Sequence, residues 1–316
     1  MGVGLRASWA EGFRAPDLNQ LFGGSSTSFE QINDPCNDPG NAGRFPACFS
    51  QSDPSLNQFV VVTGGNPDLH PERTHSIGFG VDWQHQFDGV HVATALDYFR
   101  LLQRDVVDTQ AQYIVNENAA NAAFPNRVTR DRAGNITRVV ATFLNIRQRD
   151  IQGLDVSANV SWTRPDAGAF ELTLQATHLR DFTDRVAPGL ESVDQAGTFT
   201  DSAAGGNGAL PPWKASLAVR WYKGVWRGQY DVFFVSGLKE LIPIKERPRR
   251  MEQWTIHNIQ LSYLGPASAW FRVSLGVNNL LNEPPPWSAA AFNDSHDSRT
   301  YDITGRYGYL RVEKSM

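Results

Sequence analysis

The feature that most constrains this chain is a strict alternation of apolar and polar residues. It is clearest in Leu154–Trp162, Phe170–Thr177 and Phe271–Asn278, where the two kinds of residue change places at nearly every step. A period of two gives a β-strand one apolar and one polar face. Weaker versions of the pattern occur over Val3–Trp9, Ile77–Trp83, Val90–Tyr98, Trp213–Trp221, Trp226–Phe234, His257–Tyr263 and Tyr307–Val312. The sequence therefore predicts ten strands in an all-β fold, and no segment has comparable helical periodicity.

The connections between these segments alternate in length. The short ones have turn chemistry suited to hairpins and cover residues 87–89, 164–168, 223–224 and 265–268. The long ones cover roughly residues 14–73, 106–143, 181–210, 238–252 and 281–304. Loops of that length are uncommon in a compact soluble domain. Outer-membrane barrels, in contrast, have short periplasmic turns and long extracellular loops. We therefore predict an antiparallel transmembrane β-barrel.

The composition agrees with this prediction. The chain has 316 residues, 41% of them apolar, and contains no uninterrupted apolar stretch long enough for a transmembrane helix. A barrel strand exposes only every second residue to lipid, so its composition can look soluble. The formal net charge of −4 gives no basic footprint for nucleic acid. We therefore expect no nucleic-acid partner.

Aromatic and charged residues add two further patterns. Aromatic residues cluster near the short turns, as expected for a girdle at the membrane–water boundary: Trp83, Phe87, Trp162, Trp221, Tyr222, Trp226, Tyr263 and Trp270. Charges fall on the strand face opposite the aliphatic one: Arg6, Asp97, Asp155, Lys214, Arg220, Asp231 and Arg272. That face would line a wet lumen in a barrel, or meet solvent in a soluble β-sandwich.

Cys36 and Cys48 are the only two cysteines, and they enclose a short polar loop. An even pair of this kind predicts a disulfide in an oxidising compartment, with two free thiols as the alternative. Two cysteines are too few for a zinc site with four cysteine ligands. We predict no metal site and no cofactor.

Four segments resemble TonB-dependent receptors, in the order that this family has them. Phe13-Arg14-Ala15-Pro16 resembles the turn that ends one barrel strand, and Asn66-Pro67-Asp68-Leu69-His70-Pro71-Glu72 resembles the signature that opens the next. Val277–Asn282 is similar to the motif closing the penultimate strand, and Gly305–Arg311 resembles the last strand. Singly these motifs are weak, but four in order indicate the family.

The resemblance implies a bacterial outer-membrane active transporter. In this family a barrel of about 22 strands surrounds a plug, and a periplasmic segment couples the plug to TonB. Ten strands without a plug, TonB box or signal peptide imply that residues 1–316 are the C-terminal portion of such a barrel. The implied partners are outer-membrane lipid and lipopolysaccharide, the remaining barrel strands and the plug, with TonB reached only through the plug region. The chain ends in Lys314-Ser315-Met316 instead of the family's usual aromatic residue.

The implied ligand is a scarce nutrient that is large for a porin: a siderophore, haem, cobalamin or an oligosaccharide. Basic and aromatic residues in or beside the long loops are candidate ligand contacts, namely Arg14, Trp213, Lys245, Arg247, Arg249, Arg250 and Trp287. A solvated loop is the alternative for the basic cluster, and an outer girdle is the alternative for the tryptophans. No catalytic motif is present, so we predict that the chain is not an enzyme. Two other hypotheses stay open: a complete small outer-membrane channel or barrel-embedded enzyme, and a soluble β-sandwich binding module.

Overall fold

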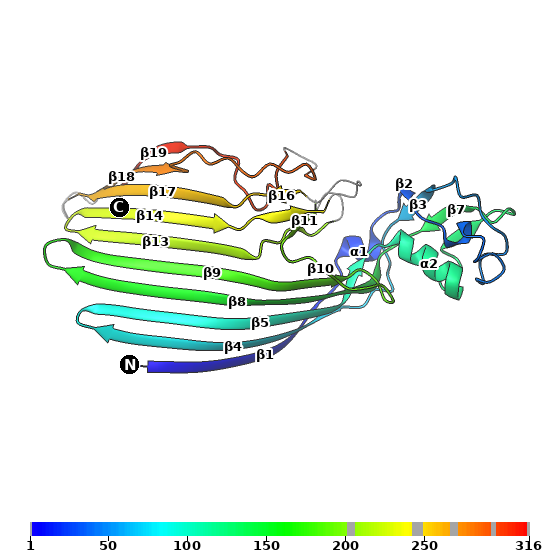
Figure 1. The fold of residues 1–316 in the computed structure, drawn as a ribbon, viewed down its shortest axis with the longest axis horizontal. Coiled ribbons are helices and arrows are strands. Elements are labelled where there is room, and N and C mark those ends of the chain that lie inside the picture. The colour runs from blue at the N-terminus through cyan, green and yellow to red at the C-terminus, as the bar shows by residue number, and fades with distance from the viewer. Residues whose placement is uncertain (1, 201–205, 242–248, 266–270, 292–294, 315–316) are drawn as a thin grey trace.

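The computed structural model describes residues 2–200, 206–241, 249–265, 271–291 and 295–314. A sheet of ten long antiparallel strands, called the wall below, forms the body of the molecule (Figure 1). All ten predicted strands are present, and they lie side by side in chain order. The wall strands are β1 (Gly2–Arg14), β4 (Glu72–Phe87), β5 (Val90–Asp108), β8 (Leu144–Arg164), β9 (Gly168–Arg185), β13 (Trp213–Lys223), β14 (Trp226–Val235), β17 (Trp254–Leu264), β18 (Phe271–Asn278) and β19 (Tyr307–Lys314).

The wall is an open sheet within the described part of the chain. β1 pairs only with β4, and β19 pairs only with β18, so each leaves one backbone edge without a partner there. The short turns lie together at one end and the long loops at the other (Figure 1). Both chain ends lie at the short-turn end, as an even number of strands requires.

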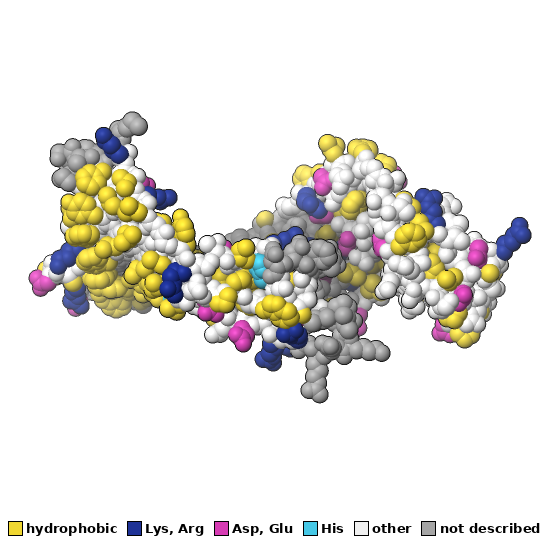
Figure 2. Space-filling view, turned by 90° about the horizontal axis from the view of Figure 1, so that it is seen from above, with side chains coloured by type: hydrophobic (Ala, Val, Ile, Leu, Met, Phe, Trp, Pro, Cys, Tyr) yellow, Lys and Arg dark blue, Asp and Glu magenta, His cyan; other side chains and the backbone are white. Residues whose placement is uncertain are grey.

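Register gives the wall two chemically different faces. One continuous row across six strands contains Arg6, Asp97, Asp155 and Lys214. The row beside it points to the opposite face and is apolar: Leu5, Val81, Leu96, Val156, Ala176 and Ala215. Figure 2 shows hydrophobic side chains gathered at the end of the molecule that carries the short turns. The predicted separation of charged and aliphatic faces is confirmed.

The apolar face ends before the strands do. Toward the long loops it gives way to polar pairs, in which Arg100 Nε lies 2.9 Å from Asp150 Oδ1 and His75 Nδ1 lies 3.3 Å from Glu11 Oε1. The strands extend further than the sequence predicted. Polar residues occupy both faces in this region, so the alternation by which a strand is recognised in the sequence disappears there.

Aromatic rings line the rim at the short turns, as predicted. The rings of Trp162 and Phe170 stack at 5.2 Å, and those of Trp226 and Tyr263 meet edge-to-face at 5.3 Å. Tyr222 differs from the prediction, because its position in β13 turns it to the polar face, where its hydroxyl lies 3.4 Å from Glu171 Oε2. The predicted girdle residue Trp270 lies outside the described residues.

Two long loops fold together into a first loop module, made of residues 18–63 and 111–141. Its elements are α1 (Leu18–Phe22), β2 (Ser26–Gln31), a 3-10 helix (Pro35–Asn37), β3 (Gln58–Thr63), α2 (Ala111–Asn121), β6 (Val128–Arg130) and β7 (Ile136–Val140). Parallel pairing of β3 with β7 joins the two loops into one sheet of order β2-β3-β7-β6. Val61, Ile114 and Val139 form its fully buried core. α2 showed no helical periodicity in the sequence, because it is Ala- and Asn-rich and weakly amphipathic.

A disulfide and a buried ion pair hold the extended part of this module. Cys36 and Cys48 are bonded, as predicted, with their Cα atoms 5.2 Å apart, and they pack on Ala119 of α2. Asp34 accepts two bonds from Arg130, at 2.7 Å and 2.8 Å, and both side chains are buried. These contacts tie a segment with little regular structure to β6 and α2.

A second loop module forms beside the wall from short strands of two other loops. β11 (Thr198–Thr200) pairs with β12 (Gly208–Ala209) and, in parallel, with β15 (Leu238–Glu240), which pairs with β16 (Arg250–Met251). β10 (Val193–Asp194) pairs with β9. The core of this module consists of Phe199, Val235, Leu238, Met251, Trp254 and Tyr301. Among the described residues, no helix is long and apolar enough to cross a membrane.

Candidate functional site: the inner face beneath the loop modules

A pocket of about 570 Å³ opens on the polar face of the wall, called the inner face below, at its long-loop end. β9, β13, β14 and β17 supply its floor, including Lys214, Phe233 and Trp254, and Thr300 and Asp302 reach it from the loop before β19. This volume is within the range of small-molecule sites, about 300–1,000 Å³, and the mixture of aromatic and polar lining is typical of them.

The second loop module borders this pocket, because Val235 and Trp254 both line the pocket and belong to the core of the module. Trp254 lies at the start of β17, and its ring meets that of Tyr301 edge-to-face with centroids 5.5 Å apart. Burial, with a smaller contribution from Asp297, raises the pKa of the Tyr301 hydroxyl to about 12. The phenol is neutral at physiological pH, and its ring packs the loop before β19 against Trp254 beside the pocket.

A charged network lies on the inner face nearer the first loop module. Arg147 donates to Asp184 at 2.8 Å and to Asp108 at 2.9 Å, and Asp184 is fully buried. Arg149 donates to Asn207 at 3.0 Å, and its buried Nε has no hydrogen-bond acceptor within the described residues. Three strands and one loop are joined here by charge-assisted bonds, which are among the stronger hydrogen bonds in proteins.

Arg14, predicted as a ligand contact, is occupied by a partner in the wall. Its guanidinium makes a two-pronged bond with Glu72, at 2.8 Å and 2.5 Å, and the same carboxylate accepts the backbone N–H of Val107 at 2.9 Å. Glu72 is buried, and these bonds join β1, β4 and β5 at their long-loop ends. A role of Arg14 toward a ligand stays a prediction, although its geometry is that of a structural clamp.

The other candidate contacts are divided between two places. Arg249 and Trp287 are brought together, with the guanidinium Cζ 4.3 Å from the ring centroid, and both side chains are exposed on the second loop module. Arg250 is exposed in β16, beside this pair. Trp213 is separate, because it stacks on His178 at 4.5 Å at the upper end of the apolar face. Lys245 and Arg247 lie outside the described residues.

The sequence did not single out the charged network or Tyr301, which packs beside the pocket. Arg147 and Arg149 are two residues apart, so a strand turns both to the same face, and this spacing was a usable signal. No comparable signal existed for Tyr301, because it lies in a loop whose packing depends on β17, far away in the sequence.

Comparison with known proteins identifies the family. The profile of the family described as TonB dependent receptor-like, beta-barrel matches residues 2–280. The chain is also similar to the solved siderophore receptor PirA from Acinetobacter baumannii (TM-score 0.62, 15% identity, covering 98% of this chain and 38% of that one). A variant of the ferric enterobactin receptor PfeA from Pseudomonas aeruginosa gives a TM-score of 0.60 at 16% identity, with the same coverage. No curated protein sequence matches significantly.

The open wall, with its lipid-type outer face and folded long loops, is thus part of an outer-membrane β-barrel. The chain belongs to the TonB-dependent receptor β-barrel family, whose members are transporters and not enzymes. It spans about 38% of the length of the solved receptors it matches. The hypothesis of a soluble β-sandwich is excluded, because the ten strands form one sheet with an apolar outer face instead of two packed layers.

Proposed function

We propose that this chain is the C-terminal portion of the barrel of a receptor that takes up a scarce, large nutrient in a TonB-dependent manner. The nutrient belongs to the siderophore, haem, cobalamin or oligosaccharide classes. The observation that carries the proposal is the pocket of about 570 Å³ on the inner face, bordered by the second loop module and by the loop before β19. In outer-membrane barrels the long loops face the outside, so a ligand captured there would enter the lumen from above.

The chemistry of this region favours a metal chelate that carries negative charge. Lys214 contributes a cation to the pocket, Phe233 and Trp254 contribute apolar and aromatic surface, and Arg249 lies exposed over Trp287 on the module above. Cations bind carboxylates and phenolates, and aromatic faces pack on flat ligands. The solved structures named above are called siderophore and ferric enterobactin receptors, which supports the same class.

Uptake by cells that make the receptor containing this chain tests the proposal. The panel includes an iron-55 siderophore, haem, labelled cobalamin and an oligosaccharide, each offered with and without functional TonB. We expect one class of nutrient to accumulate only when TonB is functional. The double variant Lys214→Ala, Phe233→Ala should bind that nutrient at least tenfold more weakly. Lys223→Ala, at the short-turn end, is the matched control and should bind normally.

The outcomes separate this function from its runner-up. Uptake that is independent of TonB and rises linearly with concentration would identify a passive channel instead. Binding that survives loss of both Lys214 and Phe233 would move the ligand away from this pocket. TonB-dependent uptake of an oligosaccharide would keep the transport function but remove the preference for an anionic chelate.

A further inference from the structure

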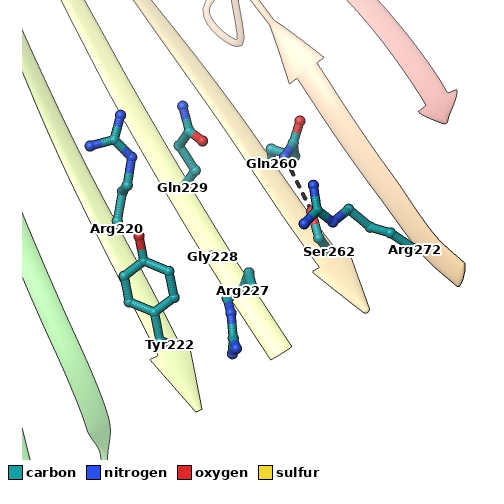
Figure 3. A pocket seen from close by; sticks show the side chains of 8 residues that line it. All are labelled: Arg220, Tyr222, Arg227, Gly228, Gln229, Gln260, Ser262 and Arg272. Atoms are coloured by element: carbon teal, nitrogen blue, oxygen red, sulfur yellow. Dashed lines mark hydrogen bonds between the residues drawn. The ribbon is translucent and has the colours of Figure 1, made fainter. Parts of the chain in front are cut away.

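A second pocket lies on the inner face of the wall at the opposite, short-turn end. Its volume is about 210 Å³, and it is lined by Arg220, Tyr222, Arg227, Gly228, Gln229, Gln260, Ser262 and Arg272 (Figure 3). These residues come from the last or first few positions of β13, β14, β17 and β18. Three of them are arginines and none is acidic, so one end of the inner face concentrates positive charge.

The three guanidinium groups are weakly compensated by the chain that the structure describes. The side chain of Arg220 has no ion pair or hydrogen bond among the described residues. Arg227 donates only to backbone carbonyls, of Gly224 at 2.8 Å and Trp226 at 2.9 Å, and lies over the Tyr222 ring at 5.2 Å. Arg272 has one acidic neighbour, Glu313, at 3.7 Å and at an exposed position.

Other acids on this face are turned to other partners. Glu171 lies opposite Arg220 in the register, but its closest recorded contact is the Tyr222 hydroxyl at 3.4 Å. Asp231 accepts from Gln229 at 2.7 Å. Three like charges around one pocket repel each other, and a cleft lined by one sign attracts the opposite charge. The arrangement is therefore one that an anion would complete.

The uncharged part of the pocket is ordered and can hold an oriented ligand. Gln260 donates to Ser262 at 3.1 Å, Ser262 and Ser274 share a hydrogen bond of 2.8 Å, and Tyr309 donates to Gln260 at 2.7 Å. Ser262 and Ser274 are buried. This network uses none of the arginine side chains, and an arginine fork matches a carboxylate with two parallel hydrogen bonds.

We propose that this pocket, formed by Arg220, Arg227 and Arg272, binds an acidic side chain of a polypeptide segment inside the barrel lumen. The volume admits a side chain but is too small for a large nutrient, which the roomier pocket at the other end would take. The pocket opens on the face opposite the aliphatic one, so membrane lipid does not reach it. The proposal rests on the proposed function, because that function requires a lumen filled by a further part of the receptor.

Photo-crosslinking in cells tests the pocket directly. p-Benzoylphenylalanine is introduced in place of Gln229 in the receptor that contains this chain, and irradiated outer membranes are digested for mass spectrometry. We expect a crosslink to a peptide of the same receptor that carries Asp or Glu. Arg220→Gln, combined with Arg272→Gln, should lower its yield at least fivefold.

Arg164→Gln is the matched control, because it removes one exposed arginine at the same end of the wall but outside the pocket. Arg220→Lys, used in place of Arg220→Gln, keeps the charge and should give a higher crosslink yield than Arg220→Gln. Heat-modifiable electrophoretic mobility confirms that each variant is folded, and Arg220→Gln alone removes no contact that the structure records.

A crosslink to lipopolysaccharide or phospholipid, or an unchanged crosslink in the double variant, would overturn the proposal. Loss of nutrient uptake with the crosslink intact would instead overturn the transport function and leave this site in place. A crosslink to a receptor peptide without acidic residues would also contradict the proposal that the arginine pocket binds an acidic side chain.

Discussion

The wall and the first loop module bury their apolar side chains in opposite ways. In the wall the large apolar residues point outward, and Leu5 and Leu275 are 81% and 62% exposed. In the module they point inward, and Val61, Ile114 and Val139 are 0% exposed. One chain therefore contains a part built for lipid and a part built for water, and the boundary between them lies within single strands.

The difference also decides what stabilises each part. The wall depends on backbone hydrogen bonds between long antiparallel strands, since the lipid offers no partners for backbone groups. The module depends on a packed core, one disulfide and one buried ion pair. A substitution should thus affect one part and leave the other intact, which gives four ways to test the comparison.

Breaking the buried ion pair should have the largest effect. Arg130→Met leaves the Asp34 carboxylate buried without a cation, and such a loss costs about 3–5 kcal/mol. Hydrogen exchange of the module should rise while the wall stays protected. Arg138→Met, which removes an exposed arginine from β7 in the same module, is the control and should change little. Equal exchange in both variants would contradict a structural role for the pair.

A charge on the outer face should affect the wall by a similar or smaller amount. Leu174 lies on the apolar face of β9, and Leu174→Arg in the middle of the membrane should cost about 2–4 kcal/mol. Folding into phospholipid vesicles, followed by urea titration, measures this cost. Gln175→Arg puts the same charge one residue further, on the polar face, and should cost little. Similar costs for the two would refute the assignment of faces.

Removing the disulfide should destabilise only the first loop module. Replacing Cys36 and Cys48 by alanine removes a crosslink between residues 12 positions apart. In the chain-entropy description, such a crosslink stabilises the folded state by about 3 kcal/mol. Limited proteolysis should cut the segment between β2 and β3 faster, whereas the wall keeps its heat-modifiable mobility. Slower folding of the wall in this variant would show that the two parts are coupled.

The smallest effect concerns Tyr301 and alkaline pH. Its pKa of about 12 exceeds the ordinary value of about 10, so its contribution to stability is complete below pH 10 and is lost as pH rises through 12. Absorbance at 295 nm should show a tyrosine that titrates near pH 12, and Tyr301→Phe should abolish that step. A late step that persists in Tyr301→Phe would assign it to another tyrosine.

The strand content of the wall could be predicted because the membrane imposes a period of two on each strand. Segments such as Leu154–Trp162 carry the pattern without interruption, since one face meets lipid and the other water. The pattern fails in the part of the strands nearer the long loops, where Arg100 and Asp150 pair on the outer face. The loop modules were missed for a related reason, since their short strands pair across distant loops and carry no long alternation.

The candidate site was predictable only in part. Arg249 and Trp287 were both singled out, and the structure brings them into contact although 37 residues separate their numbers. Arg14 was also singled out, but its partner Glu72 comes from another strand, so its clamp could not be inferred from local sequence. The arginine pocket escaped notice because its residues lie on four strands, and only their common register brings them together.

The parallel pairing of β3 with β7 has a consequence for the order of assembly. These strands belong to loops that leave the wall between β1 and β4 and between β5 and β8. Their sheet can close only after both hairpins have been aligned, and loop closure over such distances is slow. The same holds for β11 and β15 in the second module. Each module thus joins two loops that a pair of wall strands separates in the chain, so its sheet is the last part of its region that local contacts alone could form.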